Sequence, residues 1–169
     1  NVTDMLAMFS SAESFNQNIN SWDVSKVTDM GSMFSNTKSF NQDISGWDVS
    51  NVTNMSGLFA GSSFNGQISS WNTSKVTDMS SMFTFNYDFN QDINDWDVSN
   101  VTDLYSLFLS ATSFNQPIGD WDVSNVTSCQ YTFLNASVFN QSINTEEITK
   151  NGITYVSWDT TNVTIMEQT

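Results

Sequence analysis

Residues 22–44 read WDVSKVTDMGSMFSNTKSFNQDI, and close variants of this phrase recur along almost the whole chain. The tryptophan that opens the phrase returns at five later positions, in steps of 25, 24, 25, 25 and 37 residues. A fixed period in this range is typical of chains in which one structural unit stacks on the next. Each position of the phrase therefore predicts a column of equivalent side chains, and function depends on what the outward columns present.

The spacing of apolar residues within the phrase predicts one short strand and one short helix in each unit. Residues 22–24 alternate apolar, polar and apolar side chains, as a half-buried strand does. Residues 27–34 place Val, Met, Met and Phe at steps of three, three and one, the pattern of a helix face. We therefore expect an α/β fold with a single domain over residues 1–169. It would be a right-handed leucine-rich-repeat solenoid of about six coils, with a parallel sheet on one face and short helices on the other.

Most columns of the phrase have a structural interpretation. Burial of one aromatic side chain contributes roughly 1.5–3 kcal/mol, so one Trp column and two Phe columns make a sufficient core. An Asn column without exceptions predicts a ladder of amides that bond along the stack. A column rich in Asp precedes the expected helices and predicts helix N-caps. Its members are Asp4, Asp29, Asn54, Asp78, Asp103 and Ser128.

The composition excludes several classes of function. The chain carries 18 acidic residues, four lysines and no histidine, with a formal net charge of −14. Such a surface repels nucleic acid and anionic membranes and favours cations or cationic partners. No apolar run approaches the ~18 residues of a membrane span, so we expect no membrane insertion. Without histidine, a Gly-rich phosphate loop or an activated cysteine, the residues assemble no catalytic site, and we predict that the protein is not an enzyme.

The repeated pattern N-V-T-D-M-x-x-M-F-x-x-A-x-S-F-N-Q-D-I-x-x-W-D-V-S resembles the BspA-type bacterial surface leucine-rich repeat. The resemblance covers residues 1–143 and resumes at Trp158. It implies a leucine-rich-repeat fold, an extracellular location at the bacterial cell surface, and a role in attachment or ligand binding. Much of that family is of unknown function, and the resemblance implies no catalytic residues.

The chain departs from the phrase in two places. The third unit is one residue short and carries Asn72-Thr73 in place of Asp-Val. After Ile143, an insertion over residues 144–157 delays the next tryptophan to Trp158. Within the insertion, Asn151-Gly152 lies between two β-prone runs, which is a strong hairpin signal. A hairpin near the end of a repeat array predicts a C-terminal cap over the exposed core, with a partner-binding protrusion as the alternative.

An acidic column directly follows the tryptophans and is the first candidate for ligand binding. Neighbouring coils lie ~4.8 Å apart, so these carboxylates repel one another unless something offsets the charge. Three offsets stay open: hydrogen bonds from nearby serines and backbone N–H groups, calcium, or a cationic ligand. For calcium, which takes about six to eight oxygen ligands, the best site is the set of doubled acids Asp95, Asp97, Asp120 and Asp122. The ligand-binding candidates are Asp23, Asp48, Asn72, Asp97, Asp122 and Asp159, with Tyr105 and Tyr131 from irregular positions.

These features predict an extracellular ligand-binding module of a bacterial surface adhesin. Its concave sheet would bind a protein, peptide or glycan on another cell surface, with calcium stabilising the fold or completing the site. The alternative is a structural spacer that holds another domain away from the cell and binds no ligand. An outward face that varies from coil to coil favours the binder, and a uniform face favours the spacer. A homodimer is left open by the sequence.

Overall fold

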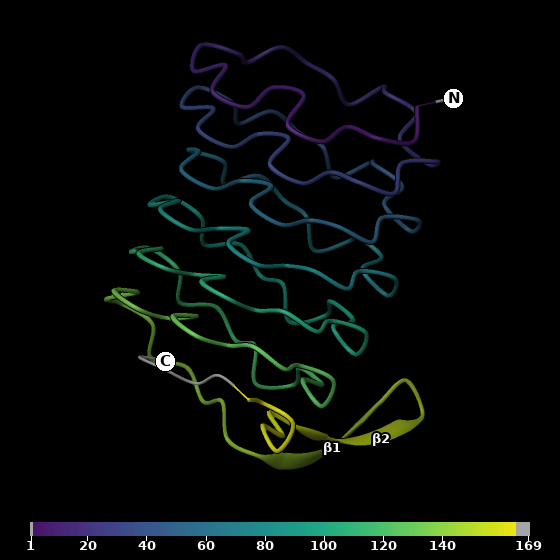
Figure 1. Ribbon diagram of the computed structural model, residues 1–169, viewed down its shortest axis with the longest axis vertical. Helices are drawn as coiled ribbons and strands as arrows, with labels where there is room; N and C mark the ends of the chain where they lie inside the picture. Colours follow the sequence, from purple (N-terminus) through teal and green to yellow (C-terminus); the bar gives the residue numbers. More distant parts are fainter. Residues whose placement is uncertain (1, 165–169) are drawn as a thin grey trace.

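The computed structural model describes residues 2–164 and shows the repeats stacked coil upon coil, with a hairpin near the C-terminal end (Figure 1). We number the coils by their residues: coil one is 2–25, coil two 26–50, coil three 51–74, coil four 75–99, coil five 100–124 and coil six 125–161. Backbone hydrogen bonds join equivalent positions of successive coils. The Thr28 N–H donates to the Thr3 carbonyl at 2.8 Å, and the Thr53 N–H donates to the Thr28 carbonyl at 2.9 Å.

Helices are absent from residues 2–164, and the strands in that range are β1 (Glu146–Lys150) and β2 (Ile153–Ser157), which pair antiparallel. The prediction of an α/β, right-handed leucine-rich-repeat solenoid, with a parallel sheet and short helices, is therefore wrong. The part of the chain that the structure describes also holds no helix with the length and apolar character needed to cross a membrane.

The segments expected to be helical are successions of tight turns. In coil one, the Met8 N–H donates to the Met5 carbonyl (3.2 Å) and the Ser10 N–H donates to the Ala7 carbonyl (3.0 Å), as in successive β-turns. Ala7 and Ser11 have φ angles of 53° and 61°, and this left-handed region interrupts a helix. Because successive turns place an apolar side chain toward the core at steps of three residues, the spacing in the sequence is the same as that of a helix face.

The column predicted to cap helices closes these turns instead. Asp29 Oδ1 accepts the Gly31 N–H at 2.8 Å, and Asp78 Oδ1 accepts the Ser80 N–H at 2.8 Å. In such an Asx-turn a short side chain satisfies the backbone two residues on and competes with helix formation. Isolated parallel bridges run through the same column from coil to coil. The predicted helix N-caps Asp4, Asp29, Asn54, Asp78, Asp103 and Ser128 are the members of this bridge column.

Side-chain bonds take the place of the parallel sheet that was expected at the Trp-x-Val segments. Trp47 Nε1 donates to the Ile19 carbonyl of the previous coil (3.2 Å), and Asn51 Nδ2 donates to the Ser25 carbonyl (2.8 Å). The backbone N–H of Trp47 turns back to the Ile44 carbonyl of its own coil at 3.1 Å. Since side chains and local turns satisfy these backbone groups, the segments form no ladder of strands.

The core consists of two stacked phenylalanine columns flanked by the tryptophans. In coil two, the ring centroids of Phe34 and Phe40 lie 4.1 Å apart, and Phe34 lies 5.8 Å from Phe59 in the next coil. All three side chains are fully buried. Such stacked pairs contribute about 0.5–1.5 kcal/mol beyond the area that they bury. The Phe columns are packing residues, as the sequence predicts.

The insertion within coil six forms a β-hairpin, as its Asn-Gly pair predicts. Strands β1 and β2 pair from Glu146 with Ser157 to Lys150 with Ile153. Asn151 and Gly152 make the two-residue turn with φ angles of 55° and 81°, the positive values that a type I′ turn requires. The register places Ile148, Lys150, Ile153 and Tyr155 on one face of the hairpin.

Candidate ligand-binding cleft

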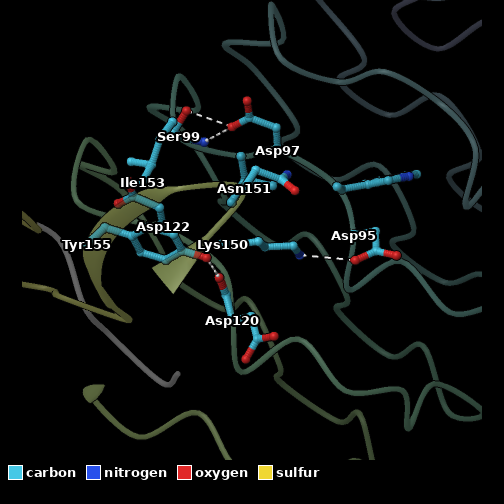
Figure 2. A pocket seen from close by; sticks show the side chains of 11 residues that line it. Asp95, Asp97, Ser99, Asp120, Asp122, Lys150, Asn151, Ile153 and Tyr155 are labelled. Carbon is cyan, nitrogen blue, oxygen red and sulfur yellow. Dashed lines mark hydrogen bonds and ion pairs between the residues drawn. The ribbon is translucent and has the colours of Figure 1, made fainter. Parts of the chain in front are cut away.

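The hairpin folds back against the side of coils four and five. Lys150 Nζ lies 3.2 Å from Asp95 Oδ1 and donates to the Asn94 carbonyl at 2.8 Å. The Tyr155 hydroxyl donates to the Asp120 carbonyl. Figure 2 shows Lys150 and Tyr155 pointing from the hairpin toward the coils. The insertion therefore covers part of the acidic column. Capping of the exposed core by this hairpin stays a prediction of the sequence.

A cleft of about 130 Å³ lies between the hairpin and the coils (Figure 2). Its coil side carries the doubled acids of coils four and five, which are Asp95, Asp97, Asp120 and Asp122. Its hairpin side is formed by Lys150, Ile153 and Tyr155, among others. The lining thus combines four carboxylates, one ammonium group, one phenol and the aliphatic side chains of Val98 and Ile153. This combination suits a cationic group that carries an apolar stem.

Hydrogen bonds from the following serine hold the acidic column in place. Asp97 Oδ1 accepts the Ser99 N–H (3.0 Å) and the Ser99 hydroxyl (2.6 Å). Asp23 Oδ1 accepts the same two groups of Ser25 at 3.1 and 2.6 Å, and the Ser25 hydroxyl, followed by its N–H, lowers the pKa of Asp23. Backbone N–H bonds of this kind recur from the serine two residues on at Asp48, Asn72 and Asp122, and from Thr161 at Asp159. Of the three offsets to charge repulsion, hydrogen bonding is the one that the structure shows.

The cleft gathers only some of the residues that the sequence singles out. Asp97 and Asp122 line it, together with Asp95 and Asp120 from the doubled acids. The ring centroids of Tyr105 and Tyr131 lie 5.7 Å apart in an edge-to-face pair that does not line the cleft. The predicted candidates outside the cleft are Asp23, Asp48, Asn72, Asp159, Tyr105 and Tyr131.

Sequence reasoning missed Lys150 and Tyr155, which it assigned only to a hairpin. One signal for them is present, because an Asn-Gly turn fixes the cross-strand register and puts both side chains on one face. Lys150 is also one of only four cations in a chain of net charge −14, so it is drawn to the acidic column. The sequence does not say which coils the hairpin contacts.

The predicted calcium quartet lines the cleft without forming a coordination cage. Among residues 2–164, no group of three or more Asp, Glu, Cys or His side chains converges as metal ligands do. The Lys150 ammonium group also pairs with Asp95, one of the four proposed ligands. Calcium binding stays a prediction of the sequence. Equal Tm values in millimolar calcium and in chelator would exclude it, because a ligand that binds the folded state raises Tm.

Tyr155 reports on the electrostatics of the cleft. Burial, and then the charges of Asp120, Asp122 and Asp97, raise the pKa of Tyr155 above the ordinary value. A raised pKa keeps the hydroxyl protonated, so its stabilising bond to Asp120 is fully present below the ordinary tyrosine pKa and is lost as pH rises through the raised value.

We therefore expect Tyr155 to ionise above the ordinary tyrosine value, in the last step of an absorbance titration at alkaline pH. The last step should disappear in Tyr155→Phe and should remain in Tyr87→Phe, whose ring is exposed outside the cleft. A last step that survives in Tyr155→Phe would show that the hairpin does not hold the phenol against the acids.

A family model described as "Mycoplasma protein of unknown function, DUF285" matches residues 1–73 and again residues 47–146. The chain belongs to this family. Coils one to five lie wholly within the matched part, and the match ends at Glu146, where β1 begins. The cleft thus joins acids from the DUF285 repeats to a hairpin that extends beyond the matched residues. The family description assigns no function and does not bear on the BspA-type resemblance. No curated protein and no solved structure matches the chain.

Proposed function

We propose that this chain is an extracellular binding module of a bacterial surface protein, and that its cleft receives a lysine or arginine side chain of a protein or peptide. The observation that supports the proposal best is the position of the hairpin. The one long interruption of the repeat lies over the two coils that carry doubled acids. The binding surface is this cleft, in place of the concave sheet that the sequence suggested.

The size of the cleft favours one side chain of a larger partner. Pockets for small-molecule ligands usually enclose about 300–1,000 Å³. The cleft, at about 130 Å³, is smaller than this range. Affinity would then come from further contacts along the outward column, whose carboxylates hold a fixed geometry on their serines. A partner with several basic residues fits such a surface best.

The hairpin already shows how an ammonium group binds here. Lys150 pairs with Asp95, whose side chain is 85% exposed. An ion pair exposed to this extent contributes only about 0–1 kcal/mol, so a ligand cation competes with it at little cost. Ile153 and the Tyr155 ring, which also line the cleft, offer apolar surface for the methylene stem of an inserted side chain.

The proposal is tested with N-acetyl-lysine amide, and with N-acetyl-norleucine amide as the uncharged control, added to the isotope-labelled chain. We expect the lysine derivative alone to shift the NMR signals of Ser99 and Asn151 in a saturable way, with an affinity that falls as ionic strength rises. Asp97→Asn should weaken binding about tenfold, the effect of losing one charge-assisted hydrogen bond.

Asp23→Asn is the matched control, because Asp23 has the same two bonds from its serine and lies outside the cleft. Equal weakening by Asp23→Asn, or equal shifts with the norleucine derivative, would contradict a specific cleft. No binding at all would favour the spacer function. Labelling of intact cells with an antibody against the hairpin tests the surface location.

A further inference from the structure

A regular amide ladder runs along the stack. Asn115 Oδ1 accepts the Asn140 N–H at 2.9 Å and the Gln141 Nε2 group at 3.0 Å, both from the next coil. Asn90 Oδ1 accepts the equivalent two hydrogen bonds, from the Asn115 N–H and from Gln116 Nε2. The same two donors reach Asn65 from coil four and Asn16 from coil two. Each of these four asparagine oxygens is therefore satisfied twice.

Asn41 is the exception among the asparagines that have a further coil of the ladder after them. Within residues 2–164 its Oδ1 accepts the Asn65 N–H (2.9 Å), and no glutamine amide joins it, because Gly66 stands at the glutamine position of coil three. A Cβ atom at Gly66 would lie 2.7 Å from the ring of Phe64, which is fully buried and has no room to move. The short coil thus excludes the side chain that completes the ladder elsewhere.

A hollow of about 300 Å³ opens at this point, between coils two and three. Apart from Gly66, every residue that lines it is polar, and four are amides: Asn41, Gln42, Asn65 and Gln67, with Asp43 and Ser45 beside them. Its volume is at the lower end of the range of about 300–1,000 Å³ found for small-molecule pockets. The hollow lies on different coils from the hairpin cleft and shares no lining residue with it.

We infer that this hollow binds a neutral, hydroxyl-rich ligand, such as one hexose unit of a glycan, and that a ligand hydroxyl donates to Asn41 Oδ1 in place of the glutamine amide. Side-chain amides present a donor and an acceptor in one plane and so complement a pair of adjacent hydroxyl groups. The Asp43 carboxylate, fixed by the Ser45 N–H at 2.9 Å, accepts a further hydroxyl. The net charge of −14 disfavours anionic sugars.

The test is an NMR titration of the isotope-labelled chain with glucose, galactose, mannose and N-acetylglucosamine. We expect at least one sugar to shift the side-chain amide signals of Asn41 and Gln67 in a saturable way, while Asn90 and Asn115 stay unchanged. Asp43→Ala should weaken this binding about tenfold. The matched control is Asp92→Ala, which should leave sugar binding unchanged. Asp92 Oδ1 accepts the Asn94 N–H at 3.0 Å, as Asp43 Oδ1 accepts the Ser45 N–H, but Asp92 does not line the hollow.

Three outcomes would overturn the inference. They are the absence of saturable shifts with all four sugars at tens of millimolar, equal weakening by Asp92→Ala, and equal shifts along the whole ladder. The Ser99 and Asn151 signals should stay unchanged in the sugar titration. A failure here therefore leaves the lysine cleft standing, and a failure of the cleft leaves this hollow standing.

Discussion

Phe83→Ala is expected to lower the free energy of unfolding by about 3–5 kcal/mol, the loss found when a buried ring is truncated. Phe83 is fully buried in coil four. Its ring centroid lies 3.9 Å from Phe89 in the same coil, 5.9 Å from Phe59 before it and 5.6 Å from Phe108 after it. Because these neighbours are themselves held by stacking, they have little freedom to fill the cavity that the substitution leaves.

The matched control is Phe85→Ala, two residues along the same coil. The Phe85 side chain is 47% exposed, so its truncation should change stability by no more than about 0.5 kcal/mol. Both variants are compared with the parent chain by urea denaturation, under conditions in which different probes give coincident transitions. Equal losses in the two variants would contradict a core built from stacked rings.

The sequence was sufficient to predict which side chains are buried. A column of identical apolar residues at a fixed period has to pack against itself, so Phe34, Phe59 and Phe83 could be assigned to the core without knowing the backbone. The turn at Asn151-Gly152 was predictable for a local reason, since only a few residue pairs accept two positive φ angles. Both predictions depend on one residue type or one short motif.

The backbone of the coil was not predictable in this way. Steps of three residues fit a helix and a succession of β-turns equally well. The left-handed positions of the coils are occupied by Ala7, Ser32, Ser106 and Tyr131 as well as by glycine. These residues adopt positive φ because N–H groups on the turns bond to the next coil, as the Ala7 N–H does to the Gly31 carbonyl at 2.8 Å. Such bonds appear only after stacking.

The candidate cleft was half predictable. The doubled acids stand out in the sequence because Asp95 and Asp120 occupy a position that is Ser or Gly in the other coils. Their partners do not, since Lys150 and the Asn94 carbonyl that it reaches are 56 residues apart. The position at which the hairpin contacts the stack depends on the path of the residues that flank it. No local sequence pattern predicts that path. The coils that Lys150 contacts therefore become known only from the three-dimensional structure.

Asn86→Ala is expected to cost roughly 2–5 kcal/mol, although alanine is the natural residue at the same position of coils five and six. Asn86 is fully buried, donates through Nδ2 to the Phe64 carbonyl at 2.9 Å, and accepts the Phe89 N–H at 3.0 Å. In coil five the Phe114 N–H bonds instead to the carbonyl of Ala111, at 3.1 Å. The asparagine is needed only beside the short coil.

The short coil explains this difference. Coil three has one residue between Ser62 and Phe64, whereas coil five has two between Ala111 and Phe114. In the short coil the Phe64 N–H therefore donates to the Ser62 hydroxyl at 3.3 Å. The Asn86 side-chain amide, from the next coil, donates to the Phe64 carbonyl. Alanine leaves two buried backbone groups without partners, each at a cost of about 1–3 kcal/mol. Asn125→Ala is the control, since it removes one exposed bond to the Ser99 carbonyl and should cost at most about 1 kcal/mol. A smaller loss of unfolding free energy in Asn86→Ala than in Asn125→Ala would mean that the neighbouring coil does not compensate for the missing residue.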